Sequence, residues 1–268
     1  MELNGKRVLL SGATGGLGRA IAEALAREGA ELVISSRRQP ELEGLARALP
    51  GGADRHEVIV VDLAEEGAAE KLVRDAGDLD GLVANAGLPG VGGLEKLDKD
   101  DVTRTLRVNL EAPMLMAREV IPQLTEKREG HIAFISSLNG KAATPRTAVY
   151  CATKFGMRGF ALALREDLHP RGVGVSLVSP GFIREAGMFA DAGVKAPPGL
   201  GTISPKKVGE AVVSAIRRNR AEVEPATLRL RIATAFAHRH PELAARVQRR
   251  GGADKIAESL VEGHAGKR

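Results

Sequence analysis

The sequence predicts an α/β fold in which a doubly wound parallel sheet carries helices on both faces. Apolar runs of strand length alternate with helical patterns at least six times along the chain. These runs are continuously apolar rather than alternating with polar residues, which is typical of parallel strands buried on both faces. The first run leads into a glycine-rich turn that opens a helix, which is the local context of a dinucleotide-binding fold.

The first expected strand covers residues 6–11, and a helix over 19–28, closed by Gly29, follows the glycine-rich turn. Strand, turn and helix in this order are typical of a Rossmann-type unit. Glycines allow a tight turn and let the backbone approach a pyrophosphate, whose charge then lies at the helix N-terminus. A purely structural turn is the alternative. The predicted phosphate-binding residues are Gly12, Thr14, Gly15, Gly16, Leu17 and Gly18.

The second expected strand, residues 31–36, ends at the position that contacts the adenosine ribose in such folds. An acid there would bond the 2′-hydroxyl of NAD, but Ser36 is followed by Arg37 and Arg38. A guanidinium can pair bidentately with a 2′-phosphate. These three residues therefore predict NADP rather than NAD. Two surface arginines at a strand end are the alternative.

Two further strands each end in candidate cofactor-binding residues. Asp62 and Leu63 close the strand expected at 58–63, and Asn85, Ala86 and Gly87 follow the strand at 79–84. Open α/β sheets bind ligands at the carboxyl ends of their strands. We therefore expect these residues to lie at one edge with the glycine-rich turn. Helices are expected at 40–49 and 65–76.

A long helical pattern at 98–127 contains Asn109, with Pro113 as a candidate kink. A buried asparagine in mid-helix needs its hydrogen bonds satisfied. It is therefore either a local structural bond or part of a site.

The strand expected at 131–136 leads through a loop with Ser137 to a helical segment that opens at Tyr150 and continues to Leu168. Tyr150 and Lys154 are four residues apart and share one helix face. A cation beside a phenol favours the phenolate, so the pair can move protons closer to neutral pH. The alternative is a packing tyrosine and a solvated lysine. Ser137 at the mouth of the strand, together with the glycine-rich turn, favours catalysis.

The strand expected at 172–179 ends at Pro180 and Gly181. Residues 185–203 are rich in glycine, alanine and proline, and they predict either a mobile lid over the substrate or an ordered surface loop. Helices are expected at 206–219, capped by Ser204 and Pro205, and at 228–237 and 241–250.

No repeat or interdomain linker interrupts the chain. The prediction is one domain over 1–268, in which 220–268 forms a helical C-terminal extension. The apolar faces of its helices are expected to pack on the domain or on a second subunit rather than on a membrane. These faces contain Leu230, Ala233, Phe236, Ala237, Leu243 and Val247.

Composition limits the classes of function. The chain has a net charge of +5, and residues 205–268 hold 14 Lys/Arg against 7 Asp/Glu. A basic tail can meet nucleic acid or an anionic membrane, but aromatic residues make up only 3%, which argues against stacking on bases. No window has the apolar length of a membrane span, and the N-terminus does not resemble a signal peptide.

Cysteine and histidine usage narrows the chemistry further. The single cysteine, Cys151, excludes an internal disulfide and suits a reducing cytoplasm. Without a base nearby in sequence, it is interpreted as a small buried filler rather than a nucleophile. His238 and His240 do not share a helix face and no Cys/His cluster accompanies them, so no metal site is assigned.

Over about residues 5–185 the chain resembles the short-chain dehydrogenase/reductase family. Four features carry the resemblance. They are the glycine motif from Ser11 to Gly18, with serine where threonine is commoner; Asp62; the Asn85-Ala86-Gly87 motif; and the set Asn109, Ser137, Tyr150 and Lys154, which matches the catalytic tetrad.

The resemblance implies a role for each of these residues. Tyr150 is the general acid/base and Ser137 holds the substrate oxygen. Lys154 grips the nicotinamide ribose and lowers the Tyr150 pKa, and Asn109 supports a water in the proton relay. Asp62 contacts the adenine. Pro180 and Gly181 lie beside the nicotinamide, where the backbone of Ile183 bonds the carboxamide.

The chain departs from the family pattern at two places. Glu185 stands where a threonine often donates a bond to the cofactor, and a carboxylate donates only when protonated. The chain also continues beyond the usual glycine-rich ending, which helps to form a tetramer.

The expected function is that of a cytoplasmic NADP-dependent oxidoreductase, a homo-oligomer (dimer or tetramer) that acts on a carbonyl or alcohol substrate. A non-catalytic NADP-binding regulatory protein and an NAD-preferring dehydrogenase are the alternatives.

Overall fold

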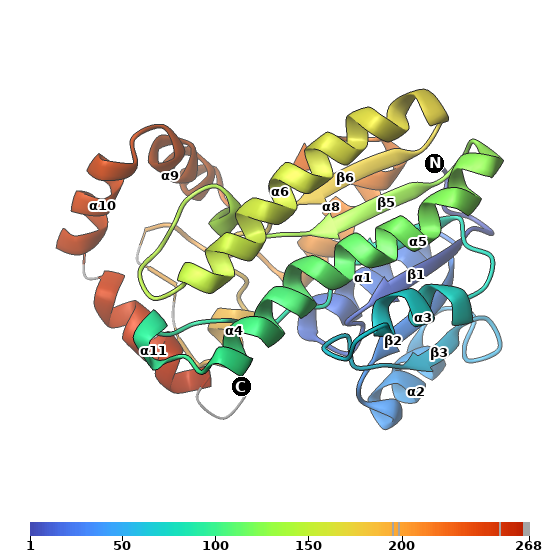
Figure 1. The fold of residues 1–268 in the computed structure, drawn as a ribbon, viewed down its shortest axis with the longest axis horizontal. Helices are drawn as coiled ribbons and strands as arrows, with labels where there is room; N and C mark the ends of the chain where they lie inside the picture. The colour runs from blue at the N-terminus through green and yellow to red at the C-terminus, as the bar shows by residue number, and fades with distance from the viewer. Residues whose placement is uncertain (195, 198, 252, 265–268) are drawn as a thin grey trace.

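Seven parallel strands form one sheet in the order β3-β2-β1-β4-β5-β6-β7 (Figure 1). The computed structural model describes residues 1–194, 196–197, 199–251 and 253–264. The strands are β1 (Arg7–Ser11), β2 (Glu31–Ser36), β3 (Glu57–Val60), β4 (Gly81–Ala84), β5 (His131–Ile135), β6 (Gly174–Val178) and β7 (Glu222–Val223). The chain winds outward from β1 in both directions, which confirms the predicted doubly wound parallel sheet.

Helices connect the strands and extend past the last one. Those within the sheet region are α1 (Gly16–Arg27), α2 (Gln39–Ala48), α3 (Ala68–Asp75), α4 (Lys99–Leu106), α5 (Ala112–Lys127), α6 (Ala148–Leu168), α7 (Met188–Asp191) and α8 (Pro205–Arg217). The C-terminal helices are α9 (Leu228–Arg239), α10 (Pro241–Arg250) and α11 (Ala253–His264). Short 3₁₀ turns lie at Leu94–Lys96, Leu138–Gly140 and His169–Arg171.

Two apolar cores hold the layers together. Helices α1, α2 and α8 cover one face of the sheet, and α3, α5 and α6 cover the other. Along β1, Val8 and Leu10 pack in the first core while Leu9 packs in the second. Successive side chains of a strand point to opposite faces, so strands covered on both sides need apolar residues at every position. This requirement explains the continuous apolar runs in the sequence.

Element boundaries differ from the expected ones near the glycine-rich turn. Helix α1 begins at Gly16 rather than at Arg19, so the last glycines of the motif belong to its first turn. A Cβ atom at Gly18 would collide with the carbonyl oxygen of Gly12. Strand β3 ends at Val60, which leaves Asp62 and Leu63 in the following loop.

The long helical pattern is interrupted before Pro113 rather than kinked at it. A π-helical turn, Arg107–Glu111, separates α4 from α5, and Pro113 lies in the first turn of α5. Proline has no N–H to donate to the carbonyl four residues earlier, which belongs to Asn109. A π turn accommodates such a lost bond, and it places Asn109 at the irregular point.

Helices α9, α10 and α11 lie on the side of the molecule toward which β5 and β6 run (Figure 1). The last four residues of the predicted extension, 265–268, lie outside the described residues. Within the described part of the chain, no helix combines the length and apolar character needed to cross a membrane.

Candidate active site

The predicted site residues follow the carboxyl ends of β1, β2, β4, β5 and β6, and direct contacts join several of them. The buried hydroxyl of Ser11 accepts the backbone N–H groups of Asn85 (3.1 Å) and Ala86 (3.2 Å). The Asn85 amide donates to the carbonyl oxygens of Ser11 (3.2 Å) and Gly12 (3.0 Å). The β4 motif therefore fixes the start of the glycine-rich turn, and a hydroxyl at position 11 is needed for that contact.

Gly12 can only be glycine in this arrangement. Its φ is +66°, in the left-handed region, and an added Cβ would lie 2.7 Å from the Cα of Ala86. Gly15 and Gly16 follow with exposed backbone at the N-terminus of α1. Exposed N–H groups at a helix N-terminus form a site suited to phosphate.

Arg38 lies over the glycine-rich turn. Its guanidinium donates to the carbonyl oxygen (3.3 Å) and the hydroxyl (3.2 Å) of Thr14. The Thr14 hydroxyl in turn donates to Ser36 Oγ at 3.0 Å, which also accepts the Arg38 N–H at 3.2 Å. The end of β2 and the glycine-rich turn are thus joined through three of the predicted residues.

The sequence interpretation missed Arg19, which directly follows Gly18. Its Nε donates to the Thr14 carbonyl oxygen at 3.3 Å. Together with Arg38 it places two guanidinium groups on the Thr14 carbonyl oxygen of this turn. Its position in the first turn of the helix was the available signal, because such a side chain can reach back over the turn.

Asp62 is held by two arginines. Its Oδ2 atom lies 3.6 Å from Arg37 and 3.1 Å from Arg104 of α4, while Oδ1 accepts the N–H of Ala64 at 3.0 Å. Arg104 was not among the predicted residues. The side chain of Leu63 is buried in the core, so only its backbone is available to a ligand.

Ser137, Tyr150 and Lys154 lie together at the end of β5. The Ser137 hydroxyl accepts the N–H of Asn139 at 3.1 Å and is close enough to the Tyr150 phenol to act on its pKa. The Lys154 ammonium lies 5.5 Å from the Tyr150 ring centroid and donates to the Ile135 carbonyl oxygen at 3.0 Å. Helix α6 therefore presents Tyr150 and Lys154 as the spacing predicts.

The predicted lowering of the Tyr150 pKa is wrong for this arrangement. Desolvation by the surrounding protein raises the pKa of Tyr150 to about 12, with the nearby Ser137 hydroxyl acting in the opposite direction, although Tyr150 is only partly buried. Desolvation also lowers the pKa of Lys154 to about 8. The Lys154 ammonium donates its hydrogen bond to a carbonyl oxygen rather than to the phenol.

Asn109 uses its side chain to hold the loop after β4. Its Oδ1 accepts the N–H of Leu88 at 2.6 Å, and its Nδ2 donates to the Leu88 carbonyl oxygen at 2.9 Å. Nδ2 also lies 3.4 Å from the hydroxyl of Thr153 in α6. The sequence left open whether Asn109 forms a local structural bond or belongs to a site. The structure shows the local bond, and the Asn109 side chain lies near Lys154.

The segment after β6 contacts the residue that follows Ser137 and also helix α9. The Pro180 carbonyl oxygen accepts the N–H of Leu138 at 3.1 Å, next to Ser137. A Cβ at Gly181 would lie 2.6 Å from Leu230 of α9. Ile183 is buried and pairs with Ile203 as a parallel β-bridge. This bridge closes the base of the segment predicted as a lid.

The start of that segment is ordered against the glycine-rich turn. Ala186 is buried and lies over Gly16, where an added Cβ would collide with it. Its neighbours in a small apolar cluster are Ile183, Ile203, Val208 and Leu17. Glu185 is exposed. Residues 195 and 198 of this segment lie outside the described residues.

The loop between Ser137 and Tyr150, called here the Ser–Tyr loop (residues 138–147), is held by the C-terminal part of the chain. The Lys141 ammonium pairs with Glu222 at 2.8 Å and with Glu224. The Lys141 carbonyl oxygen lies 3.2 Å from His238 Nδ1 of α9. These contacts tie the start of the loop to β7 and α9.

Two further contacts hold the rest of the Ser–Tyr loop. Gln248 of α10 donates to the Ala143 carbonyl oxygen at 3.3 Å, and Arg146 pairs with Glu258 of α11 at 2.7 Å. Each of the three C-terminal helices thus contacts this loop. The sequence interpretation missed all of these contacts, because no local pattern links segments about a hundred residues apart.

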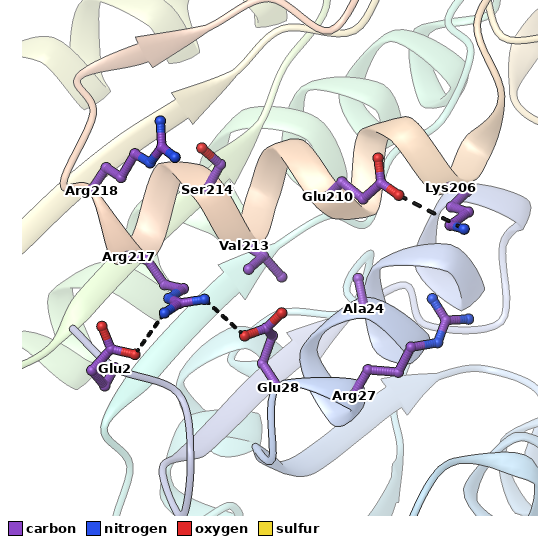
Figure 2. A pocket seen from close by; sticks show the side chains of 10 residues that line it. All are labelled: Glu2, Ala24, Arg27, Glu28, Lys206, Glu210, Val213, Ser214, Arg217 and Arg218. Carbon is purple, nitrogen blue, oxygen red and sulfur yellow. Dashed lines mark hydrogen bonds and ion pairs between the residues drawn. The ribbon is translucent and has the colours of Figure 1, made fainter.

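A separate groove runs between α1 and α8 (Figure 2). Its charged groups largely neutralise one another, since Arg217 pairs with Glu2 at 3.2 Å and with Glu28 at 3.1 Å. None of the predicted site residues lines it. The C-terminal edge of the sheet is therefore the candidate active site.

Comparison with known proteins agrees with this assignment. The sequence profile of the short chain dehydrogenase family matches residues 6–195. The chain is 36% identical over 225 residues to the ketoacyl reductase HetN of Nostoc sp., covering 82% of this chain and 78% of that protein. It is 35% identical over 184 residues to the 3-oxoacyl-[acyl-carrier-protein] reductase FabG of Rickettsia prowazekii, covering 69% and 75%.

Solved structures agree as well. A short-chain dehydrogenase from Streptomyces avermitilis superimposes with a TM-score of 0.76 at 25% identity, covering 92% of this chain and 98% of that one. The fold, the family profile and these relatives together show that the chain belongs to the short-chain dehydrogenase family, whose members are NAD(P)-dependent oxidoreductases acting on CH–OH groups.

Proposed function

We propose that the protein is an NADP-dependent oxidoreductase that transfers a hydride between nicotinamide and a carbonyl/alcohol substrate. The observation that carries the proposal is the grouping of Ser137, Tyr150 and Lys154 at the end of β5, where the Ser137 hydroxyl is close enough to act on the pKa of the Tyr150 phenol and the Lys154 ammonium lies 5.5 Å from the Tyr150 ring centroid. The similarity to HetN and FabG, which are named as reductases of ketoacyl compounds, supports a ketone as the reducible group. In this proposal, residues 220–268 are a helical extension of one domain over 1–268.

The residues at the glycine-rich turn fit a dinucleotide. Gly12 leaves no room for a side chain, and Gly15 and Gly16 lie exposed at the start of a 12-residue helix. Arg37 and Arg38 would hold the 2′-phosphate, and Arg19 adds positive charge beside Thr14. Because no acid occupies the end of β2, the 2′-hydroxyl of NAD finds no partner there.

The side chains near the end of β5 supply the proton chemistry. In the reducing direction, Tyr150 donates a proton to the substrate oxygen, and the Ser137 hydroxyl donates a hydrogen bond to that oxygen as negative charge develops. The bound cofactor supplies the hydride. The raised pKa of Tyr150, about 12, keeps the phenol protonated and ready to donate. Lys154, with a pKa of about 8, exchanges protons near neutral pH and orients the nicotinamide ribose.

In this proposal, Asn109 contributes its backbone carbonyl oxygen rather than its side chain. Its side-chain amide is occupied by Leu88, so a water in the proton relay would bond to its backbone carbonyl. That carbonyl cannot accept a bond from Pro113, which leaves capacity for such a water.

The proposal extends to assembly. Phe155 of α6 is 41% exposed and Leu106 of α4 is 39% exposed, on helices that contact each other. Apolar side chains on these neighbouring helices support a homo-oligomer formed through this face.

Fluorescence titration with NADPH and NADH tests the cofactor. We expect tighter binding of NADPH, and we expect Arg37→Ala to weaken NADPH about tenfold or more while leaving NADH nearly unchanged. Equal weakening of both would remove the 2′-phosphate assignment.

The second candidate is a non-catalytic NADP-binding protein on the same fold. The exposed Glu185, at the position where a threonine would donate to the cofactor, favours it. Turnover of ketone substrates separates the two, because NADPH binding without turnover, unchanged by Tyr150→Phe, would favour the regulatory protein.

A further inference from the structure

Helices α9 and α10 expose a row of large apolar side chains, called here the apolar stripe. On α9 the row consists of Leu228, Ile232 and Phe236, spaced four residues apart and 68%, 61% and 42% exposed. On α10 it consists of Leu243 and Val247, 47% and 61% exposed. Residues four apart lie on the same side of a helix, so each helix presents its part of the stripe as one face.

The stripe on α9 faces away from the rest of the protein. Leu230 and Thr234, on the other side of the helix, are buried, and Leu230 packs against Gly181. On α10 the buried residue is Ala244. Each of the five stripe residues keeps 42% or more of its surface exposed, and Phe236 also contacts the His240 ring. Of the two expected partners, the domain does not bury Phe236, Leu243 and Val247, and packing on a second subunit stays a prediction.

Positive charge accompanies the stripe. Residues 228–250 contain six arginines and one glutamate, a net charge of +5, which equals that of the whole chain. Among the described residues, only Arg231 of the six forms an ion pair, with Glu224 at 3.5 Å. Arg229 and Arg231 lie on either side of the α9 stripe, and Arg246 and Arg250 lie beside that of α10.

This charge selects among the occupants of the stripe. A second copy docked through the same face would bring two +5 surfaces together with only one glutamate on each to pair with arginine. Nucleic acid would need stacking partners, and Phe236 is the only Phe, Tyr or Trp in the segment. Residues that dominate the affinity of protein interfaces are enriched in Trp, Tyr and Arg, and of these three the segment has only Arg.

We propose that the α9–α10 segment docks on the surface of an anionic lipid bilayer. A helix with aliphatic and Phe side chains on one side and arginines beside them lies in the plane of the membrane interface. Its apolar residues enter the headgroup boundary while the arginines pair with lipid phosphates and carboxylates. A fluid lipid surface needs no matching shape, which suits a row of separate aliphatic side chains.

Docking would bring the membrane close to the candidate active site. Helix α9 contacts Gly181 through Leu230 and the Ser–Tyr loop through His238. The face of α9 opposite the stripe thus forms part of the wall of the site. Membrane attachment does not depend on the proposed reaction, so the two can be tested separately.

Co-sedimentation of the purified full chain with phospholipid vesicles tests the proposal. We expect binding to vesicles with about a third phosphatidylserine, none to phosphatidylcholine alone, and release near 1 M salt, where the Debye length falls to about 3 Å. Ile232→Glu should reduce the bound fraction about tenfold or more, because it places a charge in the interface. The double variant Arg246→Glu/Arg250→Glu should do the same by reversing charge beside the stripe.

Matched controls use the same substitutions elsewhere on the surface. Val60→Glu, at a 49% exposed residue of β3, and Arg47→Glu, on α2, should leave vesicle binding unchanged. Circular dichroism checks that each variant is folded. If Ile232→Glu is not folded, the double arginine variant is used for the test instead.

Three results would overturn the proposal. They are absence of binding to anionic vesicles, binding that survives both the Ile232 and the arginine substitutions, and a wild-type dimer that Ile232→Glu converts to a monomer in sedimentation. The last result would identify the stripe as an interface between copies.

Discussion

The Lys154 ammonium lies over the Tyr150 ring, 5.5 Å from its centroid, yet its hydrogen bond goes to the Ile135 carbonyl oxygen. Ile135 is the last residue of β5, two residues before Ser137. One strand end therefore positions the lysine directly and the serine through the following turn. Burial of this lysine has a cost for stability that can be measured.

Lys154→Met is expected to stabilise the folded protein at pH 7 while abolishing turnover. The pKa of Lys154 is lowered from 10.5 to about 8, so below pH 8 the buried ammonium costs about 3 kcal/mol relative to the unfolded chain. Loss of the bond to Ile135 offsets about 1 kcal/mol, which leaves a net gain of about 2 kcal/mol in urea denaturation. The wild type should itself gain stability as pH rises from 8 toward 10.5, because the unfolded state then binds more protons. A destabilised Lys154→Met variant would contradict this account.

Tyr150→Phe should lower turnover of a ketone by about 10²-fold or more, because the proton donor is lost. Its Kd for NADPH should remain within about twofold, since the ring is kept. Steady-state kinetics and fluorescence titration measure the two effects. Turnover near that of the wild type would remove Tyr150 from the mechanism.

Gly12→Ala should destabilise the fold and weaken NADPH binding. The residue has a φ of +66°, and its new Cβ would lie 2.7 Å from the Ala86 Cα. We expect a loss of about 2–3 kcal/mol in denaturant unfolding. Gly5→Ala is the matched control, because Gly5 has a φ of +70° but nothing within 4 Å of an added Cβ. Equal losses for both variants would mean that backbone strain, and not the close approach to Ala86, governs this position.

His131 should make the protein unstable toward acid. Burial lowers its pKa from 6.5 to about 3, and the ring is bonded to Ser176 Oγ at 2.8 Å. Below pH 6.5 the unfolded state binds a proton that the folded state does not, so stability should fall by about 1.4 kcal/mol per pH unit. Urea denaturation between pH 7 and 5 measures this slope. His131→Gln should reduce the slope and His169→Gln, at an exposed residue, should not; equal slopes in all three proteins would exclude His131 as the cause.

Lys141→Met should impair both stability and catalysis. The side chain is 14% exposed and pairs with Glu222 and Glu224, so its removal leaves two carboxylates close together with less compensation, at about 2–3 kcal/mol. Because Lys141 anchors the Ser–Tyr loop, we expect kcat for a ketone to fall about tenfold with the Kd for NADPH unchanged. Lys71→Met, at an exposed ion pair, is the control for a lost surface charge and should cost less than about 1 kcal/mol. An unchanged kcat in Lys141→Met would show that the loop keeps its position without this tie.

The sequence was sufficient to predict the sheet and the place of most site residues, because both depend on local patterns. Continuous apolar runs identify buried parallel strands, and the topology then brings strand ends such as Gly12 and Asn85 together. The spacing of Tyr150 and Lys154 likewise follows from helix geometry alone.

The features that could not be predicted depend on contacts between distant segments. Arg104 reaches Asp62 from α4, and Arg146 pairs with Glu258, 112 residues away. The direction of the Tyr150 pKa shift was misjudged for a related reason, because desolvation depends on everything packed around the phenol. Whether the apolar face of α9 is buried could not be predicted either. Helical spacing identifies an apolar face but does not tell what packs against it.

The ties between the Ser–Tyr loop and the C-terminal helices also bear on the order of events during translation. Ser137 and Tyr150 leave the ribosome well before His238, Gln248 and Glu258 exist to hold the loop between them. At about 5–20 residues per second, the strands around the glycine-rich turn have several seconds to assemble first. A nascent chain can therefore form the glycine-rich turn before the Ser–Tyr loop is held in place. The loop is fixed only after helices α9, α10 and α11 have been synthesised.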